Sequence, residues 1–192
     1  MEKVTIYQLF LNIWVKKKIN HIKIREPGGN PNSEKIRNLI LNNKSNFNKD
    51  TDLLLYMAAR SENMNIIKKS FNKKIILIDR FTDSTIAYQH YGMGVDLNLI
   101  ETLNKYLLKN IRVSFTFLNI VNQKNLQKRL KQRKSLNRYD KFKTSFYNKV
   151  QKGFLNLSKK QKNKYQLINS NLDIDNNEKL ILDKIDRLIK WI

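Results

Sequence analysis

Arginines stand at points of the sequence where phosphate groups could be bound. Arg25 follows the apolar stretch HIKI and Arg80 follows IILID, whereas Arg129, Arg133 and Arg138 lie in one long basic segment. The arginine side chain presents a planar fork of N–H donors that fits phosphate oxygens. Arginines that converge from separate segments suit phosphoryl transfer, in which an enzyme positions two substrates and neutralises their charge. The alternative for each arginine taken singly is a solvated surface residue.

An acid and a base follow the most apolar stretch of the chain. Ile75 to Ile78 form an unbroken apolar run, and Asp79 and Arg80 come directly after it. Such a run predicts a strand buried on both faces of a parallel sheet. Ligands of these sheets bind beyond the carboxyl ends of the strands, so Asp79 and Arg80 are expected at a binding edge. A surface ion pair that caps the strand is an equally good interpretation of this segment alone.

The elements that must position these residues alternate between strand and helix. Pro27, Gly28, Gly29 and Pro31 predict a loop over residues 25–31. Ser33 and Thr51 are expected to cap the helices that they begin. We predict strands over 21–24, 74–79, 113–121 and 165–170, helices over 5–18, 33–41, 51–71, 83–90, 96–109 and 177–190, and a basic segment over 125–161 that is helical in pieces. This alternation predicts one α/β domain over 1–192, with a parallel sheet and helices on both faces.

Composition narrows the classes of function. The 192 residues carry a net charge of +22, which favours an anionic partner, although lysines are spread along the chain together with asparagines and also fit compositional bias. The absence of cysteine excludes disulfides and zinc–thiolate sites. His21 and His90 are far apart, so any metal is expected to arrive with a substrate. No stretch is apolar enough to cross a membrane and no signal peptide is apparent, which predicts a cytoplasmic protein.

Five stretches together resemble a known enzyme family. REPGG, SEKIRNLIL, TDLLLYMAAR, DRFTDSTIAYQ and KRLKQRKSLNRYD follow one another with the order and spacing of bacterial thymidylate kinases, from about residue 3 to the end of the chain. The resemblance implies the α/β fold of the P-loop nucleoside-monophosphate kinases. It also implies phosphorylation of dTMP to dTDP by ATP with Mg²⁺, and a homodimer formed through helices.

The resemblance assigns residues to the pocket for the acceptor nucleotide. Arg25, Glu26 and Pro27 match the loop that shapes this pocket, and Arg37 matches the arginine that reaches the acceptor phosphate. Without the resemblance, Arg37 would be interpreted as a solvated helix residue.

The resemblance also assigns residues to the base and the sugar. Tyr56 matches an aromatic residue, usually Phe, that stacks on thymine, and Arg60 one turn later matches an arginine that binds a carbonyl edge of the base. Thr85 and Gln89 match residues that face the base, and Tyr88 is expected against the sugar, where it would disfavour a ribose. Spacing alone allows Tyr56 to be a core residue instead.

Catalysis is expected where the two phosphates meet. Arg80 matches the arginine that bridges the acceptor phosphate and the transferred group, and Asp79 would orient it. The segment at about 129–142 matches the lid that closes over ATP, with Arg133 and Arg138 as lid arginines and Arg129 near the adenine. The alternative for this segment is a solvated basic helix.

The start of the chain departs from the family. Thymidylate kinases begin with a central strand and a GxxxxGK[ST] loop that binds phosphates. Here Lys3 falls where the loop lysine belongs and Thr5 falls next to the place of the magnesium-binding hydroxyl, but Glu2 and Val4 replace the last glycine and the hydroxyl residue. Asn119 stands where the family has a carboxylate. We expect an N-terminally truncated form, inactive or weakly active as written; a degenerate copy is the alternative.

Two other functions compete with dTMP phosphorylation. One is a nucleoside-monophosphate kinase with a different acceptor, which Tyr56 and Arg60 weakly disfavour for purines. The other is a non-catalytic basic protein that binds nucleic acid through its charge, although the sequence contains no recognisable nucleic-acid module.

Overall fold

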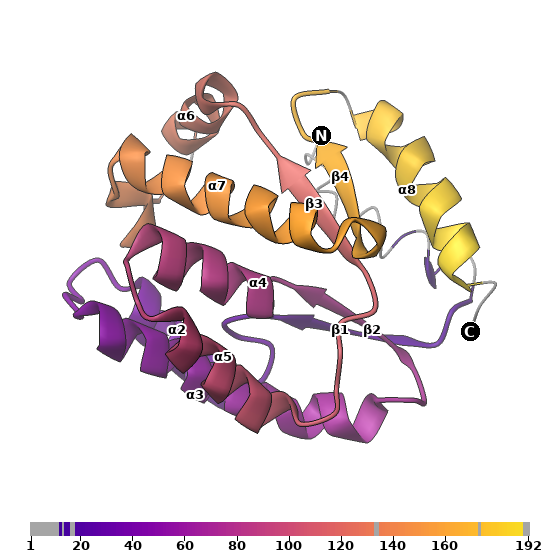
Figure 1. Cartoon of the computed structure of the whole chain (residues 1–192), viewed down its shortest axis with the longest axis horizontal. Coiled ribbons are helices and arrows are strands. Elements are labelled where there is room, and N and C mark those ends of the chain that lie inside the picture. The colour runs from indigo at the N-terminus through magenta and orange to yellow at the C-terminus, as the bar shows by residue number, and fades with distance from the viewer. Residues whose placement is uncertain (1–11, 13, 16–17, 133–134, 173, 190–192) are drawn as a thin grey trace.

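Four short strands form two parallel pairs. The computed structural model describes residues 12, 14–15, 18–132, 135–172 and 174–189. Within them, β1 (His21–Arg25) pairs with β2 (Ile75–Asp79), and β3 (Thr116–Ile120) pairs with β4 (Tyr165–Asn169) (Figure 1). The predicted α/β class and all four predicted strands are confirmed. The expected single sheet appears, in the part of the chain that the structure describes, as two separate ladders.

The strand β2 contacts apolar side chains on both of its faces. Ile76 and Ile78 pack against helices, whereas Ile75 and Leu77 face the other way, into a different apolar cluster. All five residues of β2 are nevertheless only half-buried, so the predicted complete burial is wrong. The reason is that β2 has a hydrogen-bonded neighbour, β1, on one side only within the described residues.

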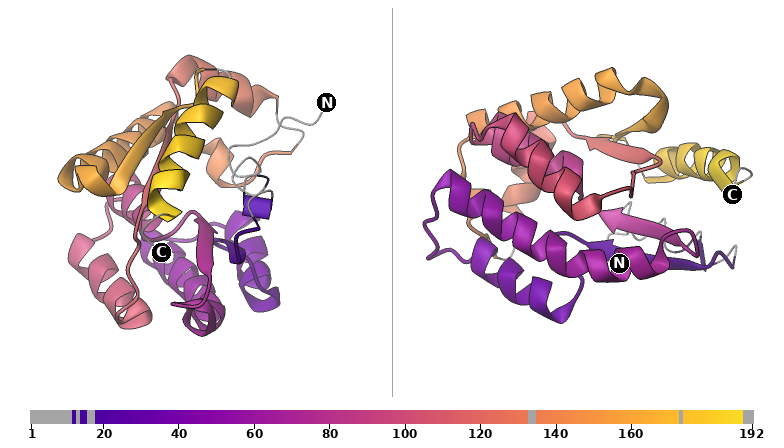
Figure 2. Two further views of the ribbon diagram at one scale, coloured as in Figure 1. Left: turned by 90° about the vertical axis from the view of Figure 1, so that its right-hand side faces the viewer. Right: turned by 60° about the horizontal axis from the view of Figure 1, so that its bottom comes forward.

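Helices cover both strand pairs (Figures 1 and 2). The helices α2 and α3 pack side by side, α5 packs on α3, and α7 runs along η1 and also contacts β3. The helical elements are α2 (Pro31–Leu41), α3 (Lys49–Ser70), α4 (Thr82–Thr85), η1 (Ile86–Gly92), α5 (Leu97–Leu108), α6 (Gln123–Lys131), η2 (Tyr139–Lys141), α7 (Thr144–Lys160), η3 (Lys162–Lys164) and α8 (Ile174–Ile189). None of the helices in the described ranges is long and apolar enough to span a membrane.

Asparagines cap the two helices that follow β1. The side chain of Asn30 accepts a hydrogen bond from the backbone of Ser33 (3.0 Å), and the side chain of Asn48 accepts one from the backbone of Thr51 (2.8 Å). The predicted caps, Ser33 and Thr51, are therefore wrong: both lie inside their helices. Asparagine is at least as good a cap as serine or threonine, and each helix begins directly after the earlier capping residue.

The helix predicted over 83–90 changes its winding along its length. It starts as α4 and continues as the π-helix η1, in which the backbone N–H of Met93 donates to the carbonyl of Tyr88 (3.1 Å). Gly92 of η1 lies against Phe146 of α7, and Gly153 of α7 lies against Tyr91 of η1. The two elements approach closely because each presents a glycine to the other's aromatic ring.

One apolar cluster joins the two strand pairs. Ile75 and Leu77 of β2 and Phe117 of β3 pack around buried Trp14 and Ile168. Trp14 belongs to the helix predicted over 5–18, most of which lies outside the described residues.

Candidate active site

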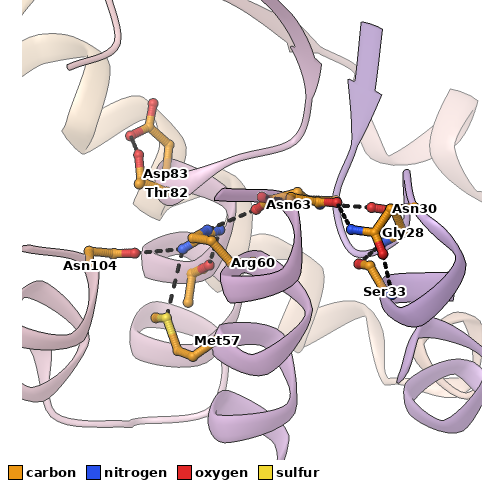
Figure 3. Close-up of polar contacts among 11 residues, drawn as sticks. Gly28, Asn30, Ser33, Met57, Arg60, Asn63, Thr82, Asp83 and Asn104 are labelled. Carbon is orange, nitrogen blue, oxygen red and sulfur yellow. Dashed lines mark hydrogen bonds and ion pairs between the residues drawn. The ribbon is translucent and has the colours of Figure 1, made fainter. Parts of the chain in front are cut away.

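The guanidinium of Arg60 lies at the centre of a buried polar network (Figure 3). Its side chain is almost completely buried; Nε donates to Glu26 (2.8 Å), Nη1 to Asn104 (2.6 Å) and Nη2 to Thr85 (3.0 Å). The ring centre of Phe81 lies 5.0 Å from the guanidinium carbon. The partners come from the loop after β1, from α5, from α4 and from the residue before α4. Arg60 is therefore a cation with a fixed orientation.

The loop after β1 is bound to α3 through Asn63. The amide of Asn63 donates to the carbonyl of Gly28 (2.7 Å) and to Glu26 (3.5 Å), and its oxygen accepts from Asn30 (2.7 Å), as Figure 3 shows. Burial raises the pKa of Glu26, and the opposing effects of Arg60 and Asn63 do not fully cancel this increase. The network fixes both the loop and the acid that contacts Arg60.

The outer side of the same loop is bound to α2. Glu34 accepts from the side chain of Arg25 (2.8 Å) and from the backbone of Gly29 (2.9 Å), and Arg37 donates to the carbonyl of Pro27 (2.9 Å). Gly29 has a φ of +100°, a conformation that glycine adopts without strain. Although burial by itself raises the pKa of Glu34, the hydrogen bonds from Arg25 and Gly29 bring it below its ordinary value.

Three arginines from separate elements converge beside this loop. Burial lowers the pKa of Arg37, and the nearby positive charges of Arg25 and Arg80 lower it further. Arg25 and Asp79 are register partners at the ends of β1 and β2, and the carbonyl of Asp79 accepts from the backbone of Glu26 (2.9 Å). Parallel pairing thus places Arg80 next to the loop. Such a concentration of positive charge suits a bound phosphate.

Arg80 has an unusual backbone conformation. Its φ is +63°, in the left-handed region, and its guanidinium carbon lies 5.2 Å from the ring centre of Tyr88. Left-handed residues other than glycine are uncommon, and they cluster at functional sites. The exposed Arg80 side chain therefore leaves the end of β2 over an aromatic ring of η1.

A second buried network lies around Asp52 of α3. Asp52 is 1 % exposed, forms an ion pair with Arg138 and accepts from the hydroxyl of Tyr139. Gln89 donates to Asp52 (3.1 Å) and to the hydroxyl of Tyr139 (3.2 Å), while its buried oxygen has no hydrogen-bond partner among the described residues. Burial raises the pKa of Tyr139. Asp52 thus joins α3, η1 and the segment before α7.

Aromatic rings connect the Asp52 network to Arg80, whose guanidinium lies over the ring of Tyr88. Tyr56 and Tyr88 each meet the ring of Tyr139 edge-on, with ring centres 6.2 Å and 5.8 Å away. The structure therefore brings together the predicted residues of the loop after β1, of α3 and of η1.

The lid residues predicted from the sequence are more scattered. Arg129 of α6 donates to the carbonyl of Ser170 (2.6 Å), beyond the end of β4. Arg138 pairs with Asp52, and Arg133 lies outside the described residues, as do Lys3 and Thr5.

Comparison with known proteins identifies the group to which this arrangement belongs. The family model described as "Thymidylate kinase" matches residues 3–181. The chain belongs to the thymidylate kinase family. A thymidylate kinase of Wolbachia from Culex pipiens is 37% identical over 161 residues, which are 83% of this chain and 76% of the relative. One from Mycoplasma capricolum is 38% identical over 173 residues, 84% of this chain and 80% of the relative.

A solved thymidylate kinase has the same fold. The crystal structure of the enzyme from Ehrlichia chaffeensis superposes with a TM-score of 0.70 at 31% sequence identity, covering 93% of this chain and 88% of the other. The family resemblance found in the sequence is therefore confirmed.

Among the buried polar residues of these networks, the sequence did not point to Asp52, Asn63 or Asn104. Asn104 had a detectable signal, because it lies between Ile100 and Leu108 on the buried stripe of α5. Asn63 similarly lies beside Met64 on the buried face of α3. Asp52 had no comparable signal, since an acid in the first turn of a helix is usually explained by the helix dipole.

Proposed function

We propose that this chain transfers the γ-phosphate of ATP to dTMP, forming dTDP for the synthesis of dTTP. The observation that carries the proposal is the convergence of Arg25, Arg37 and Arg80 beside the buried network of Arg60, because clustered arginines suit a phosphate and a fixed guanidinium suits a carbonyl oxygen. Membership in the thymidylate kinase family supports the same reaction. A different acceptor or a nucleic-acid-binding role gains no support from the relatives described above.

The base and the sugar of dTMP are assigned to residues of α3, α4 and η1. In this proposal Arg60 donates to a carbonyl oxygen of thymine, and Tyr56 stacks on the ring. Thr85 and Gln89 face the base, and Tyr88 lies against the deoxyribose. The neighbouring aromatic rings of Tyr56 and Tyr88 support this assignment. Arg25, Glu26 and Pro27 shape the wall of the pocket.

The phosphates are assigned to the ends of β1 and β2. Arg37 binds the acceptor phosphate, and Arg80 bridges it to the transferred group, with Asp79 as the orienting acid. Transfer is direct and in line, so these residues position substrates and neutralise charge without a covalent intermediate. Mg²⁺ arrives with ATP as part of the donor substrate.

The segment at about 129–142 is assigned to the ATP side. Arg133 and Arg138 neutralise phosphate charge when it closes, and Arg129 lies near the adenine. The pairing of Arg138 with Asp52 supports a defined position for the end of this segment.

We also propose that the protein is a cytoplasmic homodimer. Leu39 of α2, Leu54 of α3 and Leu99 of α5 are 47%, 56% and 42% exposed. Apolar residues exposed on neighbouring helices support dimer formation through these helices.

Calorimetry with dTMP, dUMP, dCMP and dGMP tests the proposed acceptor. We expect dTMP to bind most tightly. Preferential binding of dGMP, or equal binding of all four nucleotides, would contradict the assignment. Sedimentation of the same preparation tests the dimer separately.

A further inference from the structure

Asn104 is a polar residue on an otherwise apolar helix face. Ile100, Asn104 and Leu108 are spaced by one turn on α5, and all three are buried. A buried amide is unfavourable unless it forms hydrogen bonds. The oxygen of Asn104 satisfies this requirement with Nη1 of Arg60, at 2.6 Å (Figure 3).

This contact completes the restraint on Arg60. The guanidinium has five N–H donors in one plane. Glu26 and Thr85 accept from Nε and Nη2, Asn104 accepts from Nη1, and the sulfur of Met57 lies 3.9 Å from Nη1. One N–H of Nη2 remains without an acceptor among the described residues. Acceptors on all three nitrogens prevent the plane from turning, so this donor points in one direction.

We propose that Asn104 is a positioning residue for Arg60 and so contributes to base selection. A fixed N–H donor favours a base with a carbonyl oxygen over one with an amino group at the same place, because two facing donors cannot pair. Thymine and cytosine differ in this way at one ring position. The inference rests on the proposed function, in which Arg60 contacts the base, and adds a residue of α5 to the determinants of specificity.

A role in packing alone predicts a different behaviour. If Asn104 only filled space, leucine of similar size would replace it without changing base preference. If it acts by accepting from Arg60, an aspartate would replace it, since a carboxylate oxygen accepts the same hydrogen bond.

The test compares Asn104→Leu with Asn104→Asp. The control is Thr102→Leu, on the exposed side of α5. Calorimetric Kd values for dTMP and dCMP are measured for each protein, with thermal unfolding recorded in parallel. For Asn104→Leu we expect dTMP to bind about tenfold more weakly while dCMP binding changes less, since a buried donor loses its acceptor. Asn104→Asp and Thr102→Leu should retain the wild-type ratio of the two Kd values.

The Kd values for dTMP and dCMP test the proposed function and the role of Asn104 separately. A wild-type protein without preference for dTMP over dCMP contradicts the proposed function. A wild-type preference that persists in Asn104→Leu contradicts the role of Asn104, as does its loss in Asn104→Asp. If Asn104→Leu does not unfold cooperatively, Asn104→Ser takes its place, because serine is too short to reach Arg60 and should give the same loss of selectivity.

Discussion

Arg80 combines an uncommon left-handed backbone conformation with a guanidinium that lies over the ring of Tyr88. In a protein that also carries the GxxxxGK[ST] loop, we expect Arg80→Ala and Arg80→Gly both to lower kcat by on the order of 10²-fold, because each removes the charge that we propose acts on the transferring phosphate. Since φ at this position is +63°, the glycine variant should be more stable than the alanine variant, by about 1 kcal/mol. Steady-state kinetics and thermal unfolding measure the two effects. Unchanged kcat in both variants would make Arg80 a structural residue.

Glu34 makes a pH-dependent contribution to the free energy of unfolding. Its folded-state pKa is lowered, so its contribution is present above the ordinary carboxyl value of 4.5 and is lost as the pH falls through the folded pKa. Glu34→Gln should therefore be less stable than the wild type at pH 6, and the difference should shrink as the pH falls through the folded pKa of Glu34 and the carboxylate is protonated. Because the pair with Arg25 is partly exposed, the difference should be below about 1 kcal/mol.

Denaturant unfolding across this pH range measures the difference, with Lys35→Gln as the control for a neighbouring exposed position. A difference that grows on acidification would show that the pKa of Glu34 is raised.

Residue types and spacing pointed to many residues of the candidate site but not to the contacts between them. Arg60 and Glu26 were found in separate motifs, whereas their ion pair depends on how α3 approaches the loop after β1. Asn104 is separated from Arg60 by 44 residues, and only the packing of α5 on α3 brings them together. Local pattern cannot encode such distances, because tertiary packing decides them.

At the scale of elements, the contact between η1 and α7 depends on glycine. A Cβ at Gly153 would lie 2.6 Å from Cδ2 of Tyr91. Gly153→Ala should therefore destabilise the protein by about 1–3 kcal/mol through overpacking. In an unobstructed helix the same change stabilises by about 0.5–1 kcal/mol. Thermal unfolding measures the sign, and Lys149→Ala on the exposed side of α7 is the control; a stabilised Gly153→Ala would show that η1 gives way.

Element types were easier to predict than element boundaries. The apolar run at Ile75 to Ile78 identified β2, and the helical periodicity after Thr51 identified α3. The caps were missed because Asn30 and Asn48 precede residues that are themselves good caps. The π-helical winding of η1 has no local signal; the packing against α7 accompanies it.

The net charge of the whole molecule should make its melting temperature depend on salt. The 192 residues carry a net charge of +22, and repulsion between the excess positive side chains destabilises the compact state. Raising the salt concentration from about 0.05 to 0.5 M shortens the Debye length and should raise the melting temperature. Differential scanning calorimetry in chloride measures the shift. A flat dependence would mean that local ion pairs already balance the repulsion.

The junction between the two strand pairs should lose stability at low temperature. Within the described residues no backbone hydrogen bond connects β2 to β3, and the pairs meet through the apolar cluster around Trp14 and a hydrogen bond from Tyr165 to Asp83 (2.6 Å). Apolar burial weakens on cooling. In mild urea, a cooled sample should therefore open at this junction while its helices persist.

Trp14 can report this opening. The sequence contains one other tryptophan, Trp191, so a Trp191→Phe protein has a single tryptophan, whose emission can be excited selectively at wavelengths that tyrosine does not absorb. On cooling, its emission should shift to the red before the far-ultraviolet dichroism of the helices decreases. Coincident transitions would mean that the two strand pairs separate only when the helices also unfold. If the emission shifts first, the low-temperature limit of this protein is set where the two strand pairs meet, and not within either ladder.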